Sequence, residues 1–107
     1  MYSTGPLLSQ RQFEAIAKAL ADPRRFHLLE TISGSEDYPC SRLCEEFPVS
    51  KATISHHLKE LLRAGLVEAE RDGQYMHYRA RRDVLAAYSA TLQERLAAKG
   101  LPVLPVE

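Results

Sequence analysis

The chain of 107 residues has no tryptophan, only two cysteines, and no apolar run long enough to cross a membrane. Its N-terminus, MYSTGPLLSQ, lacks the charged and apolar regions of a signal peptide. We therefore expect a cytoplasmic protein with no membrane partner, in which both cysteines are reduced. The length and a hydrophobic content of 45% fit one domain over residues 1–107. That domain should comprise an arm at 1–8, a core at 9–99 and a proline-containing tail at 100–107.

The chain also lacks net charge, because 14 basic residues balance 14 acidic ones. The charges are nevertheless unevenly distributed. Residues 51–82 carry 7 basic and 4 acidic groups, whereas the segments on either side are net acidic. A local basic patch of this kind suits a nucleic-acid partner better than the overall balance suggests, because a phosphate backbone responds to local charge.

Sequence motifs of enzymes are missing as well. The chain has no Ser/His/Asp arrangement, phosphate-binding loop or metalloprotease motif. Cys40 and Cys44 are spaced C-x-x-x-C, whereas thiol oxidoreductases use C-x-x-C within a βαβ pattern. We therefore predict a protein that is not an enzyme and has no cofactor.

Apolar residues recur at helical spacing, and capping residues precede several of these segments. Ser9 followed by Gln12 is a capping-box pattern. Asp22 can cap a helix with Pro23 in its first position, and Ser50 can cap another. The predicted helices, with the apolar residues that share one side of each, are Ser9 to before Asp22 (Phe13, Ile16, Ala17 and Leu20), Pro23 to about Gly34 (Leu28, Leu29 and Ile32), about Ser41 to Phe47, Ser50 to Gly65 (Ile54, Leu58, Leu61 and Leu62), and about Arg82 to Lys99 (Leu85, Tyr88, Leu92 and Leu96).

The stretch LVEAERDGQYMHYRA alternates as two strands do, and Asp72-Gly73 is a favoured two-residue hairpin turn. This turn would pair Val67 with Tyr78, Ala69 with Met76, and Glu68 with His77. Two short helices joined by a tight turn and followed by a hairpin make a winged helix-turn-helix. We therefore predict a mainly α fold with a small β-hairpin, in the order α-α-α-α-β-β-α.

In this architecture the second helix of the motif enters the major groove of DNA, and the hairpin forms a wing. Lysines on the outer side of that helix can neutralise phosphates, and its shorter polar side chains can reach base edges. The expected partner is double-stranded operator DNA. The candidate contacts are Lys51, Ala52, Thr53, Ser55, His56 and Lys59 on the helix, and Arg71, Gln74, His77 and Arg79 on the wing. Arg24 or Arg25 could add a phosphate contact, and either could equally be structural.

The first and last predicted helices both carry apolar stripes, and a domain this small has little core to cover them. Pairing across a two-fold axis would bury both stripes and place two recognition helices about one DNA turn apart. We therefore expect a homodimer that associates through its first and last helices. Packing of both stripes within one monomer is the alternative.

The segments ALADPRRFHLLETI and VSKATISHHLKELLRAGLVEAERDGQYMHYRA resemble the ArsR/SmtB family of bacterial repressors. The resemblance covers residues 13–90 and includes D-P-x-R, S-x-x-x-x-S-x-H-L, A-G-L-V and a wing that ends in tyrosine. The doubled His56-His57 departs from the family, which often has Gln or Arg at one of these places. The resemblance implies a dimeric winged-helix repressor with operator contacts from Lys51, Ser55 and His56, and an inducer that releases the DNA.

The resemblance also bears on the inducer. Family members that sense zinc, nickel or cobalt use histidines of the last helix, and RRDVLAAYSATLQERLAAK contains none, so we predict no such metal site. Arsenic-sensing members commonly carry C-x-C-x-x-C in and beside the third helix. In PCSRLCEEF, Cys44 coincides with the last cysteine of that motif, and Cys40 falls on its middle residue.

Cys40 and Cys44 would lie one turn apart on a helix that includes both. Such thiols could be oxidised, could bind a soft ion such as arsenite, or could be structural in a repressor without an inducer. Their position at a helix N-terminus should lower the pKa of Cys40 and make it the more reactive thiol. A winged-helix module that binds another protein is the competing function, and a weak dependence of binding on salt would distinguish it.

Overall fold

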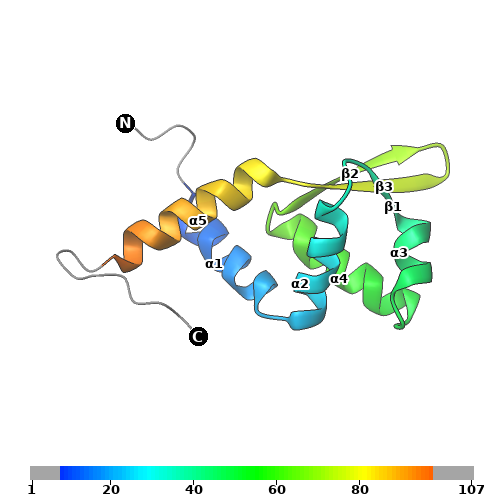
Figure 1. Ribbon diagram of the computed structural model, residues 1–107, viewed down its shortest axis with the longest axis horizontal. Coiled ribbons are helices and arrows are strands. Elements are labelled where there is room, and N and C mark those ends of the chain that lie inside the picture. Colours follow the sequence, from blue (N-terminus) through cyan, green and yellow to red (C-terminus); the bar gives the residue numbers. More distant parts are fainter. Residues whose placement is uncertain (1–7, 98–107) are drawn as a thin grey trace.

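The computed structural model describes residues 8–97, so most of the expected arm and the whole tail lie outside the described residues. Helices α1 and α5 lie side by side at one end of the molecule, and the hairpin and α3 lie toward the other (Figure 1). The elements are α1 (Gln10–Leu20), α2 (Pro23–Ser33), β1 (Tyr38–Pro39), α3 (Cys40–Glu46), α4 (Lys51–Arg63), β2 (Val67–Asp72), β3 (Tyr75–Ala80) and α5 (Arg82–Leu96).

Three helices begin where the capping residues predict. The Ser9 hydroxyl accepts a hydrogen bond from the backbone N–H of Gln12 at 3.0 Å, and the Ser50 hydroxyl accepts one from Thr53 at 3.1 Å. A carboxylate oxygen of Asp22 accepts from the first turn of α2. Each bond satisfies a donor that a helix end otherwise leaves unpaired. Helix α3 begins at Cys40, one residue earlier than predicted, and it ends at Glu46.

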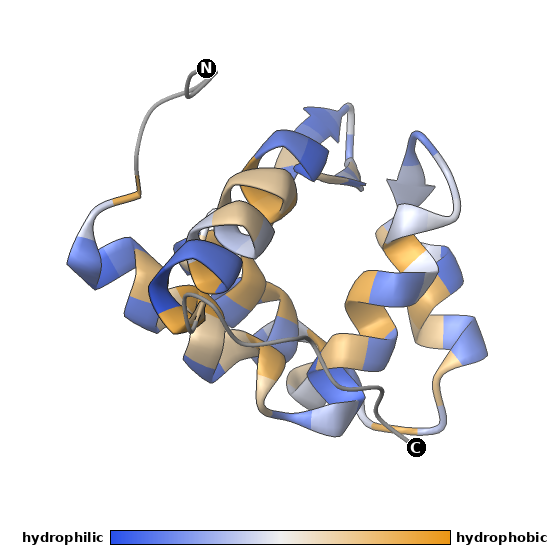
Figure 2. Ribbon diagram, turned by 60° about the vertical axis from the view of Figure 1, so that its left-hand side comes forward, coloured by the Kyte–Doolittle hydropathy of each residue, from blue (hydrophilic) through white to orange (hydrophobic). Residues whose placement is uncertain are grey.

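The core lies between α1, α2, α4 and the sheet. In Figure 2 the hydrophobic stretches of the helices lie mainly on the sides that face other helices. Three residues of the predicted apolar stripes are exposed in the described chain, namely Ala17, Leu62 at 37% and Leu96 at 75%. The buried side of α4 includes His57 in place of Leu62, and His57 is only 7% exposed. The largest fully buried side chains are Ile16, Leu28, Ile32, Leu43, Ile54, Leu61 and Leu66.

The sheet has three antiparallel strands in the order β1-β3-β2, because Tyr38 and Pro39 add a short strand that the sequence did not indicate. Tyr38 pairs with Tyr78 of β3, and the Tyr38 hydroxyl donates to the carboxylate of Glu46 in α3. Strand β1 therefore ties helix α3 to the wing.

The predicted pairing within the hairpin is wrong by two residues. Strands β2 and β3 pair Val67 with Ala80, Ala69 with Tyr78, and Asp72 with Tyr75. The two turn residues are therefore Gly73 and Gln74, and not Asp72 and Gly73. Only glycines have positive φ among the described residues, and Gly73 has φ +65°. A turn with glycine first requires positive φ at that glycine alone, whereas an Asp-Gly turn requires it at the aspartate too.

Helix α5 packs against α1 without burying any of its own residues. The rings of Phe13 and Tyr88 lie 5.1 Å apart, and Arg95 donates to the Gln10 side chain at 3.1 Å. Leu96, at the end of α5, is 75% exposed. Helix α5 ends at Leu96 and Ala97 is extended, so the predicted end at about Lys99 is too far along the chain. No helix within residues 8–97 is long and apolar enough to span a membrane.

Candidate nucleic-acid interface

Helix α4 presents a polar side to solvent. Its residues Lys51, Ala52, Ser55, His56 and Lys59 are all exposed, and they share the side opposite the core. Their arrangement follows from the 3.6-residue period, which places residues three and four apart on one face. We refer to these five residues as the recognition face.

Thr53 differs from the other candidates on this helix. Its side chain is half-buried, and its hydroxyl lies 2.9 Å from the hydroxyl of Ser50. Thr53 therefore belongs to the helix cap. The structure brings the rest of the predicted helix contacts together on one surface, with Thr53 at its edge.

The opposite side of α4 holds the helix in place. Ile54 and Leu61 are almost completely buried, and Leu58 is 3% exposed. These side chains fix the rotation of α4 about its own axis, because turning the helix would bring them into water at a cost of about 1.5–3 kcal/mol each. The recognition face is thus held in a fixed direction by the core.

Side chains at the tip of the wing are exposed, whereas side chains nearer its base are paired with other residues of the chain. Arg71 and Gln74 are exposed at the tip. Farther along β3, Nδ1 of His77 lies 3.1 Å from a carboxylate oxygen of Asp37, close enough for an ion pair but not aligned as a hydrogen bond. Arg79 donates to the Glu70 carboxylate at 2.6 Å. Two of the four predicted wing contacts therefore already have partners within the chain.

Sequence reasoning missed Tyr75, whose side chain is 57% exposed beside the turn and accepts a hydrogen bond from Gln74 at 3.3 Å. An aromatic residue next to a turn glycine was the available signal. Of the two arginines at the start of α2, Arg25 donates to the carbonyl of Ala19 at 2.9 Å, which is a structural role. Arg24 is exposed.

Comparisons with known proteins agree with this geometry. Residues 20–70 match a family described as a helix-turn-helix domain. The transcriptional repressor SdpR of Bacillus subtilis (strain 168) is 36% identical over 70 residues, which are 65% of this chain and 77% of SdpR. The arsenical resistance operon repressor of Staphylococcus xylosus is 33% identical over 78 residues, covering 73% of this chain and 74% of that protein. The chain belongs to the ArsR family of winged helix-turn-helix transcriptional repressors.

Solved structures support the same assignment. An ArsR-like transcriptional regulator from Rhodococcus sp. RHA1 superposes with a TM-score of 0.73 at 30% identity, covering 79% of each chain. A homodimeric winged helix-turn-helix DNA-binding domain from Mycobacterium bovis has a TM-score of 0.65 at 26% identity, covering 82% of this chain and 87% of that one. The predicted fold is confirmed, with β1 as an addition, and the family is one of DNA-binding regulators and not of enzymes.

The two cysteines of this ArsR-family repressor lie at the start and middle of α3. Both are free and half-buried against the core. Burial raises the pKa of the Cys40 thiol, and the neighbouring Cys44 thiol raises it further. The predicted lowering of this pKa is therefore wrong. The reason is that desolvation and a second sulfur outweigh the first turn of a seven-residue helix.

The surroundings of the cysteines connect them to the recognition helix. The charge of Lys51, the first residue of α4, acts on Cys40 and partly opposes the rise in its pKa. Cys40 and Cys44 also add to the effect of burial in raising the pKa of Tyr78 on β3. Among residues 8–97, no three His, Cys, Asp or Glu side chains gather closely enough to hold a metal ion.

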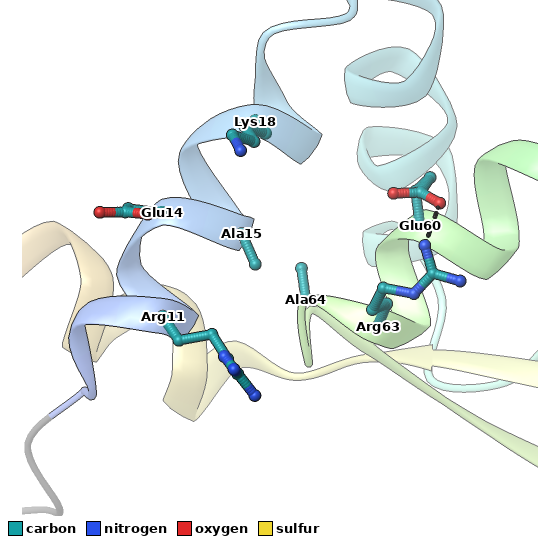
Figure 3. Close-up of a pocket in the computed structure, with 7 residues that line it drawn as sticks. All are labelled: Arg11, Glu14, Ala15, Lys18, Glu60, Arg63 and Ala64. Atoms are coloured by element: carbon teal, nitrogen blue, oxygen red, sulfur yellow. Dashed lines mark hydrogen bonds and ion pairs between the residues drawn. The ribbon is translucent and has the colours of Figure 1, made fainter.

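A pocket of about 240 Å³ lies between α1 and the C-terminal end of α4. Figure 3 shows Ala15 and Ala64 facing each other across it, with Arg11 alongside and Arg63 paired to Glu60. Its α4 residues come from the C-terminal end of the helix, so the pocket does not overlap the recognition face.

Proposed function

We propose that this repressor binds operator DNA through the recognition face of α4, with the wing beside it. The observation that carries the proposal is the division of α4 into a buried apolar side and an exposed polar side. Lys51 and Lys59 would neutralise phosphates, whereas Ser55 and His56 would donate hydrogen bonds to base edges and Ala52 would allow close approach. Thr53 would contribute from the edge of the face.

On the wing, the exposed Arg71 and Gln74 would reach the sugar-phosphate backbone or the minor groove. His77 and Arg79 would reach DNA only by giving up or sharing their contacts with Asp37 and Glu70. We therefore rank the tip of the wing above its base as a contact surface.

A homodimer formed through α1 and α5 completes the proposal. Helix α5 buries no residue of its own, and Leu96 remains exposed on it. Helices α1 and α5 lie together, away from the wing (Figure 1). Pairing of this end with a second copy would cover the apolar side chains and present two copies of α4 to successive major grooves. The relative from Mycobacterium bovis is homodimeric, which supports a dimer for this chain.

Two substitutions on the recognition face should have different effects. His56→Ala should lower the preference for the operator over unrelated DNA by about tenfold or more, because a base contact is worth about 1–3 kcal/mol. Lys59→Ala should weaken binding to both DNAs alike, since a phosphate contact carries no sequence information. Fluorescence anisotropy with the duplex upstream of its own gene and with a scrambled duplex measures both quantities.

Lys18→Ala is the matched control, because it removes the same charge from α1, away from the recognition face. His27→Ala removes an exposed histidine from α2 in the same way. If the two recognition-face variants bound both duplexes as tightly as these controls do, the assignment of the face would be wrong.

We further propose that oxidation of Cys40 and Cys44 is the inducing event. The two thiols would form a disulfide while peroxide takes up two electrons and two protons and becomes two waters. Thiols one helical turn apart have nearly parallel Cβ directions, so closing the bond requires α3 to distort. Helix α3 lies against β3 and the start of α4, so this distortion would reach the recognition face.

Peroxide treatment is therefore expected to lower operator affinity by about tenfold or more, reversibly with a reductant, if distorting α3 costs at least about 1.4 kcal/mol of binding. The same titration with Cys44→Ser should show no change on oxidation. Equal affinity of the wild-type chain before and after oxidation would reject the redox mechanism. Release by arsenite without peroxide would instead favour a soft ion bound by the same two thiols.

A further inference from the structure

His57 is the one buried polar or charged residue among the described residues. It lies on the core side of α4, one position from the exposed His56, with the two ring centroids 5.8 Å apart. Its Nδ1 is inaccessible to solvent and has no hydrogen-bond partner within the described part of the chain. The proposed operator contacts do not use this side chain, so its burial calls for a separate explanation.

Burial is the largest factor that makes a positive charge at His57 unfavourable, and several neighbouring groups add to it. Arg24 and Arg25 from the first turn of α2 and His56 from α4 itself act against protonation. The positive end of the α2 dipole adds to them. Asp22 favours protonation, and its effect on the pKa of His57 is larger than that of either arginine or of His56 alone. Its carboxylate is already engaged, because the same oxygen accepts from the backbone N–H of Arg24 at 2.9 Å and of Arg25 at 3.2 Å.

Neutral imidazole suits this position better than imidazolium does. With its proton on Nε2, the ring leaves Nδ1 as an unpaired acceptor, whereas protonation would create a charged and unpaired N–H donor in the interior. Burial is the largest cause of a lowered pKa at His57. The neutral ring can therefore pack between α4 and the start of α2, and the charged ring cannot do so without moving α4.

We propose that His57 is a positioning residue of the recognition helix, and that its protonation on acidification displaces α4 from α2 and releases the operator. This inference rests on the proposed DNA-binding function and adds a pH dependence to it. The recognition face itself contains no group that would weaken binding in acid. Protonation of His56 would add positive charge near the phosphates and strengthen it.

The direction of the effect follows from proton linkage. The pKa of His57 is below its ordinary value of 6.5 when α4 is seated, and it returns toward that value when α4 moves away. The arrangement in which α4 packs against α2 is therefore fully favoured above pH 6.5. It loses stability as the pH falls through the window between 6.5 and the lowered pKa, because the displaced state binds the proton more tightly.

The test compares three chains with the duplex upstream of the gene, from about pH 8 to about pH 5.5 at fixed ionic strength. The wild-type affinity should fall by about fivefold or more, because the displaced state binds a proton that the arrangement with α4 against α2 disfavours. His57→Gln keeps a polar side chain but cannot be protonated, so its affinity should change by less than about threefold. His27→Gln, the matched control, removes an exposed histidine on α2 outside the recognition face and should lose affinity in acid as the wild type does.

A wild-type affinity that holds or rises in acid, or an equal loss in His57→Gln, would overturn the inference. A second measurement on the unmodified protein does not depend on DNA or on the stability of a variant. In NMR spectra, the His57 ring should titrate below pH 6.5, and the amide signals of Arg24, Arg25 and α4 should move with it. A ring that titrates at or above 6.5 overturns the proposal even if the chain binds no DNA, an outcome that would separately reject the DNA-binding function.

Discussion

Replacing Leu61 by alanine is expected to lower the free energy of unfolding by about 2–5 kcal/mol, the range found for large-to-small substitutions in well-packed cores. The Leu61 side chain is completely buried and belongs to the cluster that seats α4. Its loss leaves a cavity beneath the recognition helix, so operator affinity should fall as well. Urea unfolding followed by circular dichroism measures the stability change, provided that the m-value is unchanged.

The neighbouring residue supplies the control. Leu62→Ala removes the same atoms one position along the helix, but the Leu62 side chain is 37% exposed. This substitution should lower the free energy of unfolding by about 1 kcal/mol or less, as is typical of surface positions. Equal losses for the two variants would mean that the rotation of α4 about its axis is not the one described above.

The same pair of leucines shows where the sequence is ambiguous. Leu58, Leu61 and Leu62 all fit a helical apolar stripe, and a histidine next to them does not. The structure places His57 inward and Leu62 outward because α4 packs against the polar start of α2, where an imidazole fits beside Asp22. Hydrophobic periodicity alone cannot reveal that a neighbouring element presents a polar surface.

The hairpin illustrates a different limit. Its two strands and their faces could be predicted, since a shift of two residues leaves every side chain on the same face. The two turn residues could not be predicted, because both Asp72-Gly73 and Gly73-Gln74 place a glycine where positive φ is needed. Strand β1 was missed because its two residues, one of them a proline, carry no alternation of their own. It exists because Tyr38 can pair with β3 and donate to Glu46.

At the candidate site, residue identity and spacing were enough to locate the recognition face, because helical geometry fixes which residues lie together. Residue identity and spacing were not enough to predict the ion pairs and pKa values of side chains that contact residues distant in the sequence. His77 and Arg79 are paired with Asp37 and Glu70, which the sequence did not indicate. The pKa of Cys40 similarly depends on how deeply α3 is packed.

Raising the salt concentration from about 50 mM to about 200 mM should weaken operator binding by about 10³-fold, if each subunit of a dimer neutralises about three phosphates. Lys51, Lys59 and Arg71 are the exposed cations that would do so. Each cation that neutralises a phosphate would release condensed counterions, and added salt would oppose this release. The logarithm of the affinity should therefore fall linearly with the logarithm of the salt concentration.

The slope of that line identifies the contacts. Lys59→Gln removes one phosphate contact from each subunit, so the slope should become shallower by about 2 for the dimer. Lys18→Gln, on α1, should leave the slope unchanged although it alters the net charge equally. Binding that barely responds to salt, with the same slope in all three chains, would argue for association through an apolar surface. The winged helix would then serve to recognise a protein and not DNA.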